Sequence, residues 1–182
     1  MRAVAGVARR RFLRMGILGA GAAVSPGLFA GVGRHGERRL SFYQTHTGEM
    51  LDVAYWAEGD YLVESKNRID HLLRDHRTGD VSPIRADLLD VLFAIRSTLD
   101  SREPFHVISG YRSPATNGML HARNSGVASR SLHMDGMAID IRLPGRELAL
   151  VRDCAKALQA GGVGFYPGSN FVHVDVGRVR AW

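Results

Sequence analysis

Cysteine is almost absent from this sequence, which has a single one, Cys154, among its 182 residues. A scaffold held by disulfides is therefore excluded, because such folds need even numbers of cysteines. Cys154 lies in a pattern of apolar residues three or four positions apart, from Leu148 to Leu158, which is typical of the buried face of a helix. We expect Cys154 to pack in the core rather than to act as a reactive thiol.

Internal repeats, low-complexity tracts and charge blocks are also missing after residue 40, so nothing marks a second folded domain. The length of 182 residues suits one domain of ordinary size. A composition of 45% hydrophobic, 8% aromatic and 23% charged residues excludes disordered, collagen-like and coiled-coil proteins. We expect one packed domain over residues 31–182.

Net positive charge is small outside the first 30 residues. That segment holds five arginines and no acid, and these five account for all but one unit of the formal charge of +6. In the rest of the chain, lysines and arginines are scattered among acids, whereas binding to nucleic acid needs a basic cluster. The sequence therefore argues against a nucleic-acid partner.

A long hydrophobic run is missing too, since the apolar stretch Ile17–Ala30 is shorter than the ~20 residues that span a bilayer. The preceding segment 9–14, Arg-Arg-Arg-Phe-Leu-Arg, resembles a twin-arginine (Tat) export signal. Residues 1–30 are thus predicted to engage the Tat translocon and to direct the protein to the periplasm, with cleavage after Ala22 or Ala30. The alternative is a basic amphipathic anchor.

The remaining pattern predicts an α+β fold, a small single domain with a mainly antiparallel sheet flanked by helices. Because the strands mostly lack the spacing of βαβ units, an antiparallel sheet is favoured. The expected strands are Leu40–His46 and Leu51–Trp56, which form a hairpin, and Phe105–Ser109, Met137–Ile141, Val163–Tyr166 and Phe171–Val176. The expected helices are Ser65–His76, Ile84–Leu99 with Ser82-Pro83 at its start, Pro114–Arg123 and Arg146–Ala160.

A histidine and an aspartate, His133 and Asp140, lie seven residues apart in the last third of the chain. On one helix they would be ~10 Å apart along the axis, and on one strand ~23 Å apart. A turn must therefore bring them together, and Gly136 is the residue that accepts the positive φ of such a turn. Past the turn, Asp140 points away from the face that carries Ile139 and Ile141.

The last expected strand repeats this arrangement. Three valines alternate with Phe171, His173 and Asp175, so that His173 and Asp175 share the face opposite the core. Two imidazoles and one carboxylate suit a catalytic zinc ion that keeps its fourth position for water. We nominate His133, Asp140 and His173 as metal ligands; the alternative is that they are solvated or core-capping residues.

Three segments of the sequence resemble the zinc peptidoglycan peptidases, a family typified by the zinc D-alanyl-D-alanine carboxypeptidases and related to the LAS and hedgehog-like fold. They are the Ser-Gly-Tyr-Arg-Ser segment 109–113, the Ser-x-His-x-x-Gly-x-Ala-x-Asp pattern of residues 131–140, and residues 161–175. The resemblance is closer to the Tat-exported branch of murein endopeptidase K type, and it extends from the leader through the turn at residues 46–49 to Trp182.

This resemblance implies zinc bound by the three nominated ligands and peptidoglycan stem peptides as substrate. It also implies that Arg112 faces the reacting group, where a guanidinium can pair with a terminal carboxylate or a developing oxyanion. The alternative for Arg112 is a surface salt bridge at a strand end. Tyr111 and Ser131 are expected to support the ligand turn or the substrate.

One position departs from the family pattern. Relatives place a Glu or Asp three residues before the last histidine ligand as general base, and here that position is Asn170. Asp175 is the first alternative candidate, followed by His121 and Asp135, and each can instead orient an imidazole. The other histidines are expected to be structural or solvated: His35, His46, His71, His76 and His106.

The sequence and the resemblance together predict zinc-dependent hydrolysis of an amide in a peptide cross-link between peptidoglycan strands. Either D,D- or L,D-type cross-links fit these residues. Two other functions stay open. The missing acid at residue 170 is compatible with a non-catalytic module that binds or regulates peptidoglycan peptides, and the same site would also suit a zinc enzyme that acts on another small peptide.

Overall fold

The computed structural model describes residues 36–123 and 126–182. The predicted export segment, its cleavage sites and His35 lie outside these residues. Among the described residues, none of the helices has both the length and the apolar character needed to cross a membrane.

An eight-stranded sheet runs through the described domain in the order β3-β2-β1-β4-β5-β7-β6-β8. Neighbouring strands are antiparallel except for the pairs β1–β4 and β6–β8, so the predicted α+β class with a mainly antiparallel sheet is confirmed. The strands are β1 (Arg38–Gln44), β2 (Met50–Ala57), β3 (Asp60–Tyr61), β4 (Phe105–Ser109), β5 (Ala138–Arg142), β6 (Gly162–Tyr166), β7 (Phe171–Asp175) and β8 (Arg180–Ala181).

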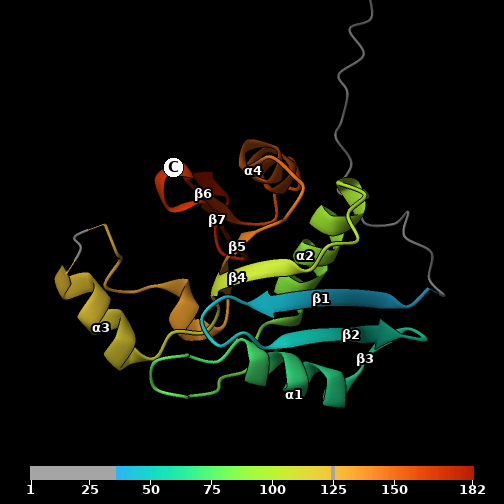
Figure 1. Cartoon of the computed structure of the whole chain (residues 1–182), viewed down its shortest axis with the longest axis horizontal. Coiled ribbons are helices and arrows are strands. Elements are labelled where there is room, and N and C mark those ends of the chain that lie inside the picture. The colour runs from blue at the N-terminus through green and yellow to red at the C-terminus, as the bar shows by residue number, and fades with distance from the viewer. Residues whose placement is uncertain (1–35, 124–125) are drawn as a thin grey trace, which may run out of the picture. The chain divides into compact units, whose positions relative to one another are not determined.

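Three of the four helices pack against this sheet, while the fourth projects from one side of it (Figure 1). α1 (Val63–Leu72) contacts β2, α2 (Ala86–Thr98) contacts β1 and α4, and α4 (Leu148–Ala157) also contacts β6 and β7. The projecting helix is α3 (Pro114–Arg123). Two short 3-10 helices, η2 (Leu132–Asp135) and η3 (Pro167–Ser169), complete the described elements.

The core lies between the sheet and its helices. It contains alternate residues of the central strands, such as Ile139 and Ile141 of β5 and Val172 and Val174 of β7. Cys154 is a free, buried thiol within this core, as its helical spacing predicts. The opposite face of β5 and β7 is thereby left to polar side chains.

Three helices, α1, α2 and α4, start or end at other residues than predicted, and α4 covers Leu148–Ala157 rather than Arg146–Ala160. α1 ends at Leu72, before the predicted His76, because the Asp75 carboxylate accepts backbone N–H groups from Arg77 and Ser113 and holds the chain in a turn. α2 begins at Ala86, with Arg85 rather than Ser82 as its N-cap residue. The N–H of Ile84 is instead bound by the buried Asp70 carboxylate at 2.8 Å.

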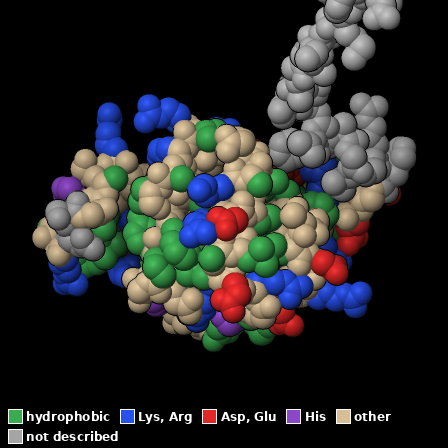
Figure 2. Space-filling model, turned by 90° about the horizontal axis from the view of Figure 1, so that it is seen from above, with side chains coloured by type: hydrophobic (Ala, Val, Ile, Leu, Met, Phe, Trp, Pro, Cys, Tyr) green, Lys and Arg blue, Asp and Glu red, His purple; other side chains and the backbone are tan. Residues whose placement is uncertain are grey.

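Charges of both signs are interspersed on the face seen in Figure 2, with acidic side chains next to basic ones. This face carries no continuous basic patch of the kind that nucleic-acid binding needs. The pattern agrees with the charge distribution expected from the sequence.

Candidate metal centre

Three buried side chains converge on the polar face of β5 and β7. The Nδ1 atom of His173 lies 2.9 Å from Oδ1 of Asp140, Nε2 of His133 lies 3.3 Å from the same oxygen, and the two ring nitrogens are 3.2 Å apart. Asp140 and His173 are direct register partners on the two strands. These three are the described His, Cys, Asp and Glu residues that group closely enough to hold one metal ion.

The turn that brings His133 to Asp140 is built around Gly136, as the sequence predicts. Gly136 has a φ of +63° and ends η2, which carries His133. A Cβ atom at this position would also collide with the carbonyl oxygen of Pro83. Gly136 is therefore required twice, for its left-handed backbone and for the close approach of the segment before α2.

Hydrogen bonds on the outer ring nitrogens fix which nitrogen each histidine presents. Nδ1 of His133 donates to the carbonyl oxygen of Gly110 at 2.7 Å, which leaves the lone pair on Nε2. Nε2 of His173 donates to Oδ2 of Asp175 at 3.1 Å, which leaves the lone pair on Nδ1. The two imidazoles thus offer different nitrogens to the same point.

The Asp175 carboxylate is saturated with hydrogen bonds. Besides His173, it accepts the N–H groups of Gly162 and Gly177 and two guanidinium contacts from Arg180, the shorter at 2.7 Å. Although burial alone raises it, these donors hold the pKa of Asp175 well below its usual range. Asp175 is 1% exposed, so the geometry favours its predicted alternative role, orienting His173, over that of general base.

The chemistry of this group suits a divalent metal ion. When the inner nitrogens of both histidines are deprotonated, three lone pairs face one another at 2.9–3.3 Å, and a metal ion would take the place of the proton that Nδ1 of His173 otherwise shares with Asp140. Ligands of one tetrahedral zinc ion at ~2.0–2.2 Å are separated by roughly 3.3–3.6 Å, close to these distances. Although burial lowers it, hydrogen bonds to Asp140 and Asp175 raise the pKa of His173 to about 9, so the site attracts a positive charge.

The Ser-Gly-Tyr-Arg-Ser segment forms the wall beside His133. Gly110 supplies the carbonyl that binds His133, and the N–H of Arg112 donates to the carbonyl oxygen of His133 at 3.1 Å. At the end of the segment, the Ser113 N–H is held by Asp75 at 2.9 Å. The backbone around Arg112 is therefore tied directly to a metal ligand on one side and to a buried carboxylate on the other.

The guanidinium of Arg112 is buried but weakly bound. Its Nη2 atom has only long contacts, 3.3 Å to Oγ of Ser109 and 3.5 Å to Oδ2 of Asp140, and its Nε atom has no partner among the described residues. Burial lowers the pKa of Arg112. Arg112 is 9% exposed, so its predicted alternative, a surface salt bridge, is wrong. Its spare donors are available to a carboxylate or an oxyanion.

A cavity of about 480 Å³ opens over these groups. Arg112 lines it together with Arg130 and Arg180, and its only acidic lining residue among the described ones is the metal-ligand candidate Asp140. Three aromatic residues, Tyr166, Phe171 and Trp182, form another part of the lining. The cavity thus combines a positive charge with an aromatic surface beside the candidate metal site.

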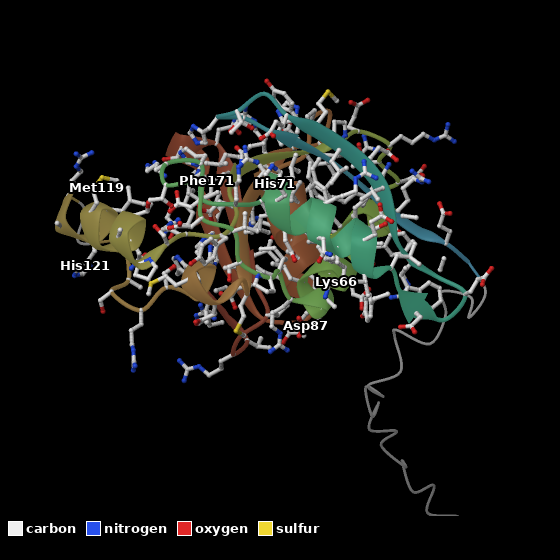
Figure 3. All side chains as sticks on the ribbon, turned by 90° about the horizontal axis from the view of Figure 1, so that it is seen from below. Lys66, His71, Asp87, Met119, His121 and Phe171 are labelled. Carbon is white, nitrogen blue, oxygen red and sulfur yellow. The ribbon has the colours of Figure 1, made fainter. Side chains whose placement is uncertain are left out.

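The other residues nominated from the sequence lie in different places. Ser131 lines the cavity, whereas Tyr111 packs against the hydrophobic core and Asn170 occupies an exposed left-handed turn before β7. His121 is exposed on α3, where Nδ1 contacts the Val127 carbonyl oxygen at 2.6 Å, and it lies apart from Phe171 of β7 (Figure 3). Asp135 is exposed on η2. None of His121, Asp135 and Asn170 lines the cavity.

Of the other histidines, four are described, and none belongs to the metal-ligand group. The rings of His46 and His76 stack at 3.9 Å, His106 packs against Tyr43, and His71 is exposed on α1. These positions agree with the predicted structural or solvated roles.

Two glycines of β6 leave the space for functional side chains that were not predicted from the sequence. A Cβ atom on Gly162 would collide with the Asp175–Arg180 pair, and one on Gly164 would press into the rings of Tyr166 and Trp182. The signal was present in the sequence, because glycines at alternate positions of a strand indicate close approach on one face. The glycine pattern did not indicate which side chains pack against the strand.

Asp175→Asn is expected to lower the zinc affinity by about 10- to 100-fold, because the neutral amide no longer fixes the tautomer of His173. Competition with a chromogenic chelator measures this change. The matched control is Asp153→Asn, at an exposed carboxylate on α4 that pairs with Arg152. If Asp175→Asn instead left the affinity unchanged and abolished turnover of the zinc-loaded protein, Asp175 would be the base.

Comparison with known proteins adds an independent line of evidence. A family model described as peptidoglycan L,D-endopeptidase MepK matches residues 33–182. The peptidoglycan L,D-endopeptidase MepK of Escherichia coli (strain K12) is 39% identical over 175 residues, which cover 96% of each chain. The probable peptidoglycan L,D-endopeptidase MepK of Haemophilus influenzae is 37% identical over 176 residues, which cover 96% of this chain and 95% of that protein.

Proposed function

Because the chain belongs to the peptidoglycan L,D-endopeptidase MepK family, we propose that it is a zinc-dependent murein endopeptidase that hydrolyses L,D-type peptide cross-links. Membership makes the chain a peptidoglycan endopeptidase of the metallopeptidase class. That the metal is zinc and that the bond is of the L,D type are parts of our proposal.

The observation that carries this proposal is the set of three converging lone pairs beneath an open, positively charged cavity. A bound zinc ion lowers the pKa of a coordinated water to about 7 and polarises a carbonyl group, so that amide hydrolysis needs no serine or cysteine nucleophile. The one cysteine, Cys154, is in the core and takes no part.

The protein's own residues supply orientation and charge. Gly110 and Asp175 hold the two imidazoles in the tautomers that present lone pairs to one point. Arg112 lines the cavity with a weakly bound guanidinium, whose role is to stabilise the negative charge that develops on the scissile carbonyl oxygen. Arg130 and Arg180 add positive charge, which favours stem peptides with free carboxylates.

Digestion of purified sacculi of known cross-link composition tests this function. We expect soluble fragments from sacculi rich in L,D-cross-links, identified by mass spectrometry of the released peptides. Release only from D,D-cross-linked sacculi would overturn the bond specificity. Zinc binding without any released fragment would favour the other candidate, a non-catalytic peptidoglycan-binding module, for which the absence of Asp175, His121 and Asp135 from the cavity is the supporting observation.

We also propose that the protein acts in the periplasm after export by the Tat translocon, on the basis of the segment 9–14. Replacing Arg9, Arg10 and Arg11 with lysine is expected to leave the precursor in the cytoplasm, which cell fractionation and immunoblotting measure. Arg2→Lys is the matched control and is expected to be exported normally. Undiminished periplasmic product from the triple variant would reject the Tat interpretation.

A further inference from the structure

Among the described residues that line the cavity, Tyr166 is the one titratable side chain that is neither an arginine nor a nominated metal ligand. Asp175, His121 and Asp135, the acid–base candidates expected from the sequence, do not line the cavity. Amide hydrolysis needs a proton donor for the leaving nitrogen, and Tyr166 is therefore the candidate for that donor in the cavity.

The phenol of Tyr166 is held at a fixed place. Its ring stacks on Phe171 with a centroid distance of 4.6 Å, and its hydroxyl oxygen accepts the indole N–H of Trp182 at 2.7 Å. Because the oxygen is the acceptor in that bond, the hydroxyl hydrogen stays free to point elsewhere. Among the described residues, no acceptor for this hydrogen is observed.

Trp182 is itself anchored beside a metal-ligand candidate. Its ring lies 5.3 Å from the ring of His173, and the Arg180 guanidinium lies 4.8 Å from its centroid. Its backbone is bound on both sides to β6, through the carbonyl of Val163 and the N–H of Phe165. A continuous chain of contacts therefore runs from His173 through Trp182 to the hydroxyl of Tyr166.

The strand register places this pair over the candidate metal site. Gly164 is the direct partner of His173 on the neighbouring strand, and a Cβ atom at Gly164 would press into both aromatic rings. The missing side chain thus makes the space in which the indole and the phenol sit beside His173. Tyr166 and Arg112 line the same cavity.

We propose that Tyr166 is a catalytic residue that protonates the leaving nitrogen, and that Trp182 is a positioning residue that aims its hydroxyl. This inference rests on the proposed function. As the C–N bond breaks, the O–H bond of Tyr166 breaks and an N–H bond forms. The attacking water releases one proton to solvent as its oxygen bonds to the carbonyl carbon, and the phenolate regains a proton from the hydroxyl group left there. The products are a carboxylate and an amine, which takes up the released proton to become an ammonium group, and the enzyme is restored.

The chemistry of a phenol suits both halves of this cycle. Phenols are protonated in neutral water, and a phenolate is a far stronger base than a carboxylate, so it takes the proton of the carboxylic acid product. The Trp182 N–H, which donates to the phenol oxygen, stabilises the transient phenolate. The cycle needs no reactant beyond water and the peptide.

The test compares Tyr166→Phe, Trp182→Phe and the double variant on a purified L,D-cross-linked muropeptide dimer. Tyr166→Phe keeps the stacked ring and removes the hydroxyl, so kcat is expected to fall by about 100-fold or more, with KM and zinc content nearly unchanged. Trp182→Phe keeps an aromatic ring near His173 and removes the donor, so a smaller loss is expected. The double variant is expected to match Tyr166→Phe alone, since Trp182 acts through that hydroxyl.

A thioester analogue of the same dimer supplies a second readout, because a thiolate leaves without being protonated. Tyr166→Phe is expected to hydrolyse this analogue within a few-fold of the wild-type rate. The controls Tyr43→Phe and Trp56→Phe change an aromatic residue that does not line the cavity and are expected to leave kcat unchanged on both substrates.

Three results would overturn the inference while leaving the proposed function standing: wild-type kcat in Tyr166→Phe, an equal loss on amide and thioester, or multiplicative losses in the double variant. An inactive wild-type enzyme on the dimer would overturn the proposed function itself. The two failures are thus distinguishable.

Discussion

His133→Ala is expected to abolish both zinc binding and muropeptide release. The ring supplies one of three converging lone pairs. Among the described residues, no fourth His, Cys, Asp or Glu lies in this group to replace the lost ligand. Two remaining ligands hold zinc too weakly to survive purification, and a catalytic site with three protein ligands then loses its metal. The same outcome is expected for His173→Ala and for the double variant.

Metal analysis of the purified variant, alongside a sacculus digestion, measures this effect. The control is His71→Ala, which removes an exposed imidazole on α1 and is expected to keep one zinc ion and full activity. Circular dichroism separates loss of metal from loss of fold, since His133→Ala also removes the buried hydrogen bond to Gly110, at a cost of ~1–3 kcal/mol. Full zinc occupancy in the double variant would sink the ligand assignment.

Arg112→Ala is expected to keep the zinc ion and to lose about 100- to 1000-fold in kcat, the typical effect of removing one oxyanion donor. The guanidinium is buried, lines the cavity and has spare N–H groups, so its donors need no rearrangement to reach a developing negative charge. Arg112→Lys is expected to recover only part of the rate, because an ammonium group lacks the planar fork of donors.

Turnover of the muropeptide dimer with metal analysis on the same samples tests this second prediction. Arg152→Ala is a suitable control, because Arg152 pairs with the exposed Asp153 on α4 and does not line the cavity. A rise in KM with unchanged kcat would assign Arg112 to binding a substrate carboxylate instead. Loss of zinc from Arg112→Ala would show that the residue maintains the metal site.

Much of the fold was predictable from local pattern. The alternation of Val172 and Val174 with His173 and Asp175 fixes which side of β7 faces the hydrophobic core, and the structure places those side chains on the expected faces. The helix ends were less predictable, because they depend on distant partners. Asp75 binds the N–H of Ser113 and Asp70 binds that of Ile84, and no local pattern reveals either contact.

Some parts of the candidate site were likewise predictable from the sequence, and others were not. The convergence of His133 and Asp140 follows from their spacing and from the need for a turn at Gly136. The environment of Asp175 does not follow from spacing, because sharing a face with His173 does not reveal that Gly162, Gly177 and Arg180 occupy its oxygens. The contact between Tyr166 and Trp182 was not predicted for a related reason, since it joins β6 to the residue that follows β8, and the pairing of these two strands was not predicted from the sequence.

The measurement that tests the account most directly is release of peptides from L,D-cross-linked sacculi by one enzyme preparation, before chelation, after chelation and after zinc is restored. The account predicts release that stops when the metal is removed and returns in proportion to zinc, up to one ion per chain. Unchanged release from the metal-free protein would contradict it.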